Sequence, residues 1–128
     1  MKDPNYMPPQ LQAWLDNADY AKAHKYTSGK LSRGSRAAMF YAVITAYCLL
    51  KTGKQAECLD MLNDFKSQKP SDSQTATYLV AIYNHLGRHG EATVTLEYVL
   101  SLFPNQRSLS EELFYSYVRE GKLLKQQN

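Results

Sequence analysis

Residues 53–70 read GKQAECLDMLNDFKSQKP, and the landmarks of this stretch return along the chain every 34 residues. The recurring residues are the glycines Gly53, Gly87 and Gly121 and the prolines Pro70 and Pro104. A small residue also recurs, because Cys58 and Ala92 each stand five places after a glycine of the series. Glycine ends a helix where the backbone needs a positive φ, a small residue lets two helices approach closely, and proline stops a helix. The stretch therefore predicts a repeated pair of antiparallel helices.

A period of 34 residues with these landmarks resembles the tetratricopeptide repeat. The resemblance implies an all-α, tetratricopeptide-like α-solenoid of antiparallel helix pairs, with about three and a half repeats. The 128 residues, 44% of them apolar and 21% charged, suit one globular domain. The expected parts are an extended lead at 1–8 and a repeat domain at 9–128, with repeats of about 9–35, 36–70 and 71–104 and an incomplete repeat at 105–128.

The first repeat is degenerate. A helix is expected over Pro9–Asp16, and Ala18 stands where later repeats have the turn glycine. A second helix follows from about Tyr20. The clusters Ser28-Gly29 and Ser32–Ser35 are expected to break the chain, with Ser35 as a candidate N-cap.

The second repeat is expected to pair helices of about Arg36–Thr52 and Gln55–Gln68. The first of these has apolar residues on two faces, which is typical of a helix with neighbours on both sides. The pairs Ser71 with Gln74 and Ser108 with Glu111 are candidate capping boxes at the starts of later helices.

The composition indicates where the chain belongs in the cell. It contains no run of eighteen apolar residues and no charged-then-apolar N-terminal pattern, so neither a membrane span nor a signal peptide is expected. Cys48 and Cys58 are expected to be buried thiols, with a disulfide or redox pair as the alternative. A cytoplasmic location follows from these features.

The last predicted helix, which begins near Ser108, lacks a full partner helix before Asn128. Terminal repeats usually carry a polar outer face. The chain is therefore expected to be a fragment of a longer solenoid, the alternative being a module whose last helix is its own cap.

No pattern in the sequence indicates catalysis. Phosphate-binding glycine loops, Cys-x-x-Cys pairs and Gly-x-Ser-x-Gly motifs are missing from the sequence. His85 and His89 have the i,i+4 spacing of a metal pair, but Gly87 lies between them in a predicted turn. The chain is therefore not expected to be an enzyme, to hold a cofactor or metal, or to bind a small-molecule substrate.

Two surfaces are candidate binding sites. The first is a concave groove lined by the first helix of each repeat, because Tyr and Arg are frequent anchors at interfaces. Its expected residues are Phe40, Val43, Tyr47, Lys51, Thr77, Asn84, Tyr115 and Arg119. Packing between helices is the alternative role for these side chains. Repeats that clamp a C-terminal carboxylate use Lys and Asn high in the groove, where this chain has Val43 and Tyr47, so that mode of binding is disfavoured.

The second surface is a basic patch from a stretch that has no acidic residue between positions 21 and 56. Its members are Lys22, Lys25, Lys30, Arg33, Arg36, Lys51 and Lys54. Basic residues that neutralise phosphates release counterions, so RNA is one possible partner. A solvated helix face is the alternative.

A narrower resemblance rests on short motifs taken in order. They are Asp3-Pro4-Asn5, Leu15-Asp16-Asn17, Thr52-Gly53-Lys54-Gln55 with Glu57, Phe103-Pro104-Asn105, Leu113-Phe114, Tyr117-Val118-Arg119-Glu120 and Lys125-Gln126-Gln127. In order and spacing, they make the chain similar to the N-terminal region of the auxiliary subunit of the NatB N-terminal acetyltransferase.

The resemblance implies a non-catalytic scaffold that binds and activates a separate catalytic subunit. That subunit would bind acetyl-CoA and acetylate nascent chains that begin with Met followed by Asp, Glu, Asn or Gln. Association with the ribosome is also implied, and no catalytic residue is carried over to this chain. Two alternatives remain open: a free-standing adaptor that binds a peptide in its groove, and a module that contacts RNA or the ribosome.

Overall fold

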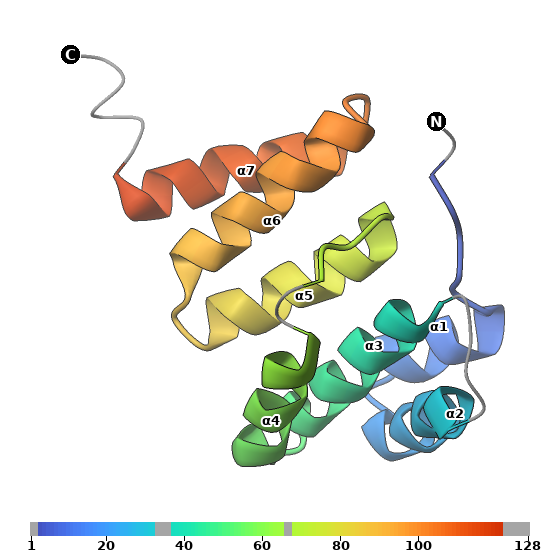
Figure 1. Cartoon of the computed structure of the whole chain (residues 1–128). Helices are drawn as coiled ribbons and strands as arrows, with labels where there is room; N and C mark the ends of the chain where they lie inside the picture. Colours follow the sequence, from blue (N-terminus) through green and yellow to red (C-terminus); the bar gives the residue numbers. More distant parts are fainter. Residues whose placement is uncertain (1–2, 33–36, 66–67, 122–128) are drawn as a thin grey trace. The chain divides into compact units, whose positions relative to one another are not determined.

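The computed structural model describes residues 3–32, 37–65 and 68–121, which form seven α-helices and no β-strand (Figure 1). The helices are α1 Pro9–Asp16, α2 Tyr20–Ser32, α3 Ala38–Lys51, α4 Gln55–Phe65, α5 Ser73–His85, α6 His89–Leu102 and α7 Arg107–Glu120. The prediction of an all-α chain is confirmed, and α1 has the predicted bounds. None of the helices in the described ranges combines the length and the apolar character needed to cross a bilayer.

The chain divides into two compact units. The α1–α4 unit comprises Asn5–Gln68, and the α5–α7 unit comprises Lys69–Asn128 together with Met1–Pro4. In the α1–α4 unit, α2 packs against α1 and α3, and α4 packs against α3. In the α5–α7 unit, α6 packs between α5 and α7. Each unit is therefore built from helices that are neighbours in sequence and in space.

One turn geometry recurs after the first helix of each pair. Gly53, Gly87 and Gly121 all have left-handed backbones, with φ of 82°, 76° and 73°. After the first two, a backbone N–H bonds the carbonyl five residues earlier, from Lys54 to Leu49 and from Arg88 to Tyr83, each at 2.8 Å. This bond closes the helix in the manner of a Schellman motif, which needs a left-handed residue. The 34-residue glycine series therefore marks helix ends that share a left-handed turn residue.

Ala18 takes the same left-handed conformation, with φ of 60°, and the N–H of Asp19 bonds the carbonyl of Trp14 at 2.7 Å. Because a Cβ in this region costs roughly 1–2 kcal/mol, we expect Ala18→Gly to raise the free energy of unfolding by about 1 kcal/mol. Urea denaturation followed by circular dichroism measures this change. Gly53→Ala is the reciprocal control, since nothing lies within 4 Å of an added Cβ there, and it should lower stability by a similar amount. Equal stability of Ala18→Gly and the parent chain would contradict the expectation.

The core of the α1–α4 unit is centred on α3. Most of its side chains are buried, namely Phe40, Val43, Ile44, Thr45, Ala46, Cys48, Leu49 and Leu50. This burial confirms the prediction of a helix that is apolar on two faces, because α2 and α4 pack on it. Cys48 and Cys58 are buried and are not joined in a disulfide, as predicted, and burial raises the pKa of Cys48 to about 12. A thiol with so high a pKa is unreactive near neutral pH.

Several predicted helix boundaries differ from the structure. Ser28-Gly29 does not break the chain but lies inside α2, where the Ser28 hydroxyl donates to the carbonyl of His24 at 2.8 Å. The second repeat's helices are shorter than expected, because α3 ends at Lys51 and α4 at Phe65. Ser35 lies outside the described residues.

Both capping-box predictions are wrong. The N-cap of α5 is Asp72, whose carboxylate accepts from the backbone N–H of Thr75 at 2.9 Å and from its hydroxyl at 2.6 Å. At α7 the N-cap is Gln106, whose side chain makes no capping hydrogen bond. Asp72 is buried, and this burial raises its pKa, although the hydrogen bonds from Thr75 oppose the shift.

The N-terminal lead supplies a further acidic group to α5. The Asp3 carboxylate accepts from the backbone N–H of Ser73 at 3.0 Å, from the Ser73 hydroxyl, and from the side-chain amide of Gln106 at 2.7 Å. A carboxylate is favoured at a helix N-terminus because the first N–H groups have no partner within the helix. Asp3 therefore ties the lead into the α5–α7 unit.

Candidate protein-interaction surfaces

The predicted groove residues fall into both compact units. Phe40, Val43, Tyr47 and Lys51 are on α3, Thr77 and Asn84 on α5, and Tyr115 and Arg119 on α7. Phe40 and Val43 are 1% and 0% exposed, so the expectation that they line a groove is corrected. Because helices cover α3 on two sides, these side chains belong to the core.

Tyr47 and Lys51 remain at the surface, near the C-terminal end of α3. The Tyr47 ring is half-buried and meets the edge of the Tyr20 ring at a centroid distance of 6.1 Å. The Lys51 ammonium lies 5.5 Å from the centre of the Tyr47 ring, within the range of a cation–π contact. These two residues therefore contact each other at the surface of the α1–α4 unit.

In the α5–α7 unit the structure brings two predicted groove residues into one cavity of about 170 Å³, which we call the α5–α7 cleft. Its lining residues are Thr77, Val80, Ala81, Asn84, Leu96, Leu109 and Glu112. The walls are mainly apolar, and the polar groups are Thr77, Asn84 and Glu112. A small apolar cavity with a few polar groups is typical of sites that accept a side chain or small group.

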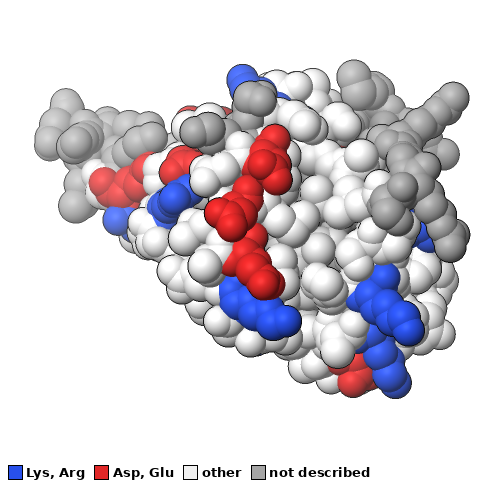
Figure 2. Space-filling view, turned by 60° about the horizontal axis from the view of Figure 1, so that its bottom comes forward, with Lys and Arg blue, Asp and Glu red and all other residues white. Residues whose placement is uncertain are grey.

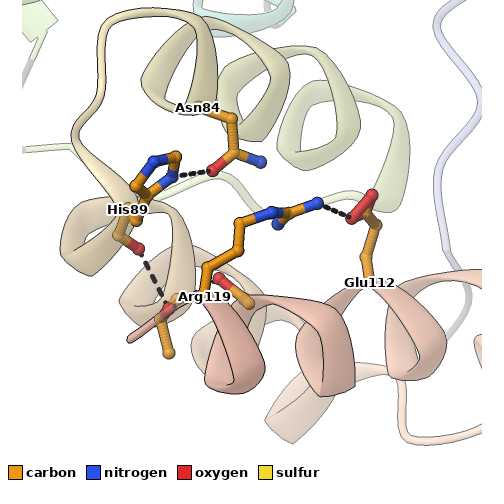
Figure 3. A network of polar contacts seen from close by, with 6 residues as sticks. Asn84, His89, Glu112 and Arg119 are labelled. Carbon is orange, nitrogen blue, oxygen red and sulfur yellow. Dashed lines mark hydrogen bonds and ion pairs between the residues drawn. The ribbon is translucent and has the colours of Figure 1, made fainter. Parts of the chain in front are cut away.

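Two polar residues of this cleft, Asn84 and Glu112, take part in polar contacts with His89 and Arg119 (Figure 3). The side-chain oxygen of Asn84 lies 2.9 Å from Nδ1 of His89, so this ring nitrogen donates the hydrogen bond. The bond fixes the Asn84 amide and directs its nitrogen away from His89. Asn84 can therefore offer N–H donors to a partner at the cleft.

Glu112 is the residue of this site that the sequence did not indicate. Its Oε2 lies 3.8 Å from a guanidinium nitrogen of Arg119 and accepts no hydrogen bond, although this atom is buried. An acidic residue near the start of a helix has an ordinary role in a favourable contact with the helix dipole, so Glu112 does not stand out in the sequence. The available signal was the seven-residue separation of Glu112 and Arg119, which is two helical turns and places both on one face of α7.

Tyr115 does not line the cleft. Its ring is 56% exposed and meets the edge of the Phe114 ring at 5.7 Å. Phe114 and Val118 are also exposed, at 53% and 52%. At the equivalent of Phe114, seven residues before the turn glycine, the earlier repeats have Ala46 and Val80, and both are buried. α7 thus presents an apolar face that no helix covers in the described part of the chain.

The described members of the predicted basic patch lie on different elements of the α1–α4 unit. Lys22, Lys25 and Lys30 lie on α2 and line a cavity with Trp14, Tyr26 and Gly29. Lys51 and Lys54 lie at the α3–α4 turn and do not line it. Arg33 and Arg36 are outside the described residues.

Acidic side chains also lie at the surface of the α1–α4 unit. Glu57, Asp60 and Asp64 are exposed on α4 at i, i+3 and i+7, which is one face of a helix. Figure 2 shows acidic side chains in a row on one face of the molecule, with basic side chains at one end of the row.

The structure separates the two predicted turn histidines. His85 ends α5 and His89 begins α6, so they do not share a helix face, as expected. Across residues 3–32, 37–65 and 68–121, no three His, Cys, Asp or Glu side chains come together in a way that could hold a metal ion.

Comparisons with known proteins agree on one family. A family model described as "Psidin, N-terminal TPR repeats region" matches residues 10–128. Similar curated proteins are the "N-alpha-acetyltransferase 25, NatB auxiliary subunit" of Homo sapiens, Mus musculus and Rattus norvegicus, each 26% identical over 114 residues. The match covers 89% of this chain and 12% of each relative, so the chain spans about an eighth of their length. No solved structure matches the chain significantly.

Proposed function

We propose a function from the premise that this chain belongs to the family of the Psidin N-terminal TPR repeats region. In this proposal the chain is a non-catalytic scaffold segment of an auxiliary subunit. That auxiliary subunit binds and activates the catalytic subunit of a NatB-type N-terminal acetyltransferase. The observation that carries the proposal is the similarity over 114 residues to proteins named as NatB auxiliary subunits. TPR-like helix pairs suit this role, because stacked repeats offer extended surfaces to protein partners. A cytoplasmic location is part of the proposal.

We place the partner contact at the α5–α7 cleft. Asn84 offers amide donors there, Glu112 has a buried oxygen that accepts no hydrogen bond, and Arg119 adds a cation beside it. A buried oxygen that accepts no hydrogen bond is only partly satisfied by an ion pair at 3.8 Å, so a partner group that donates a hydrogen bond to it gains affinity. The apolar walls would hold the aliphatic part of a partner side chain.

Co-purification tests the proposal. The full-length protein that contains this chain is co-expressed with a small acetyltransferase catalytic subunit, and we expect a stable complex that acetylates Met-Asp and Met-Glu peptides faster than the catalytic subunit alone. Asn84→Ala and Arg119→Ala should each weaken the complex about tenfold without lowering its melting temperature, as is usual for central interface residues. Arg107→Ala is the matched control, since it removes an exposed arginine from the same helix.

The possible outcomes separate the proposal from its alternatives. If no catalytic subunit binds but a peptide does, and the cleft variants lose it, the chain is a peptide adaptor. If the complex forms equally well with both cleft variants, the contact with the catalytic subunit lies elsewhere on the surface.

Contact with RNA or the ribosome is a second candidate, favoured by the clustering of Lys22, Lys25 and Lys30 on α2. Such binding should fall steeply as salt increases, because phosphate contacts release counterions. A flat salt response would remove this candidate.

A further inference from the structure

A second cavity, of about 440 Å³, lies in the α1–α4 unit and has no role in the proposed contact at α5–α7. Trp14 of α1 forms one wall, and the other lining residues come from α2: Lys22, Lys25, Tyr26, Gly29 and Lys30. Their positions follow the i, i+3, i+4, i+7, i+8 pattern, so they occupy one face of the helix. We call this site the α1–α2 pocket.

The pocket has an uncompensated positive charge. α2 contains no acidic residue. None of the ion pairs in the described ranges involves Lys22, Lys25 or Lys30. The Lys30 ammonium lies 5.4 Å from the centre of the Tyr26 ring, whereas Lys22 and Lys25 are exposed. These two lysines are therefore placed to receive carboxylates at the rim of the pocket.

The floor of the pocket is open because residue 29 is glycine. A Cβ added to Gly29 would meet no heavy atom within 4 Å, and its backbone φ is not in the left-handed region. Neither packing nor the backbone conformation therefore requires glycine at this position. Glycine in a helix interior also lowers stability by about 0.5–1 kcal/mol relative to alanine. Its effect is to leave open space in the lining of the pocket, beside the Trp14 and Tyr26 rings, for an incoming group.

The aromatic rings favour an inserted side chain over a stacked nucleobase. Tyr26 already carries the Lys30 ammonium over its ring and meets the rings of Trp14 and Tyr41 at 6.0 and 6.3 Å, in edge contacts. A base-stacking site needs an open ring face. The space beside these rings is instead suited to an apolar side chain, which gains from burial without needing a parallel ring.

We propose that the α1–α2 pocket binds an acidic peptide segment, which places an aromatic or aliphatic side chain in the pocket against the Trp14 and Tyr26 rings while its flanking carboxylates pair with Lys22 and Lys25. Such a contact buries a small surface area. Its affinity falls as ionic strength rises, because the paired charges are at the surface. It binds a different partner from the one proposed for the α5–α7 cleft.

The chain supplies its own reporter for this binding, since Trp14 is its only tryptophan. The probe is a short synthetic peptide that lacks tryptophan and carries one Phe between Asp and Glu residues. Adding it to the whole chain should change the fluorescence of Trp14 in a saturable way. A matched peptide with Ala in place of Phe, and another with Asn and Gln in place of the acids, should each bind about tenfold more weakly, a loss equal to one typical side-chain contact.

Two variants test the site from independent directions. Lys25→Glu reverses a rim charge, and Gly29→Leu fills the floor while adding a good helix former. Each should weaken binding of the Phe peptide at least about tenfold, whereas Lys54→Glu, a basic residue outside the pocket, should leave it within about twofold. Melting temperatures show whether each variant is folded.

Some outcomes overturn the proposal. One is equal binding of the Phe and Ala peptides, and another is unchanged binding by Gly29→Leu. A single-stranded oligouridylate that changes Trp14 fluorescence at lower concentration than the peptide would assign the pocket to nucleic acid. No response to either probe would also reject the proposal.

Discussion

Phe40→Ala is expected to lower the free energy of unfolding by about 3–5 kcal/mol, the usual cost of removing a buried aromatic ring. The ring is 1% exposed and lies between the rings of Tyr6 and Tyr41, at centroid distances of 5.9 and 5.3 Å. Tyr6 precedes α1 and Tyr41 is on α3, so the change also removes a contact between the N-terminal lead and the core of the α1–α4 unit. Urea denaturation followed by circular dichroism measures the effect.

Tyr115→Ala is the matched control, because the same groove prediction included both residues and the structure separates them. The Tyr115 ring is exposed on α7, so its loss should change stability by less than about 0.5 kcal/mol. If Phe40→Ala instead kept the parent stability and lost only a binding partner, the placement of Phe40 in the core would be wrong.

The features that the sequence predicted well are local. Gly53 and Gly87 end α3 and α5 because a left-handed turn needs no Cβ, and this requirement can be read from a few adjacent residues. α1 begins after Pro8 and ends before the Ala18 turn, so its bounds follow from the same local chemistry. The 34-residue interval then repeats these local signals, which is why the helix pairs and the all-α class could be predicted.

The features that the sequence missed depend on contacts between distant residues. Asp3 bonds the N-terminus of α5 across 70 positions in the chain, and no local pattern indicates that pair. α3 is apolar on two faces, so helical spacing alone could not decide whether Phe40 faced a neighbouring helix or a partner. At the cleft, Thr77 and Asn84 were expected, but Glu112 was not, because an acid near a helix start has an ordinary explanation.

A buried hydroxyl pair joins α6 to α7. The oxygens of Thr93 and Ser116 are 2.6 Å apart, and both side chains are 0% exposed. The Thr93 hydroxyl also donates to the carbonyl of His89 at 2.9 Å. Since a hydroxyl has one proton, Ser116 must be the donor in the pair when Thr93 donates to His89. The bond therefore gives the buried Ser116 its only partner among the described residues.

Thr93→Val keeps the shape of the side chain and removes this partner. We expect it to lower the free energy of unfolding by about 1–3 kcal/mol, the cost of leaving a buried donor unsatisfied. Thr77→Val is the control: the Thr77 hydroxyl donates to the carbonyl of Ser73 at an exposed site, so its loss should cost less than about 0.5 kcal/mol.

A double-mutant cycle isolates the pair. Ser116→Ala removes the donor, and Thr93 still bonds His89, so this single change should cost about 0.5–1.5 kcal/mol. When both hydroxyls are removed, no buried donor is left without an acceptor. The double variant should therefore lose less stability than the two single variants together, by about 1 kcal/mol. If the changes in the free energy of unfolding of the two single variants were strictly additive, water or another group would satisfy the Ser116 hydroxyl. The α6–α7 contact would then be held by its apolar residues alone.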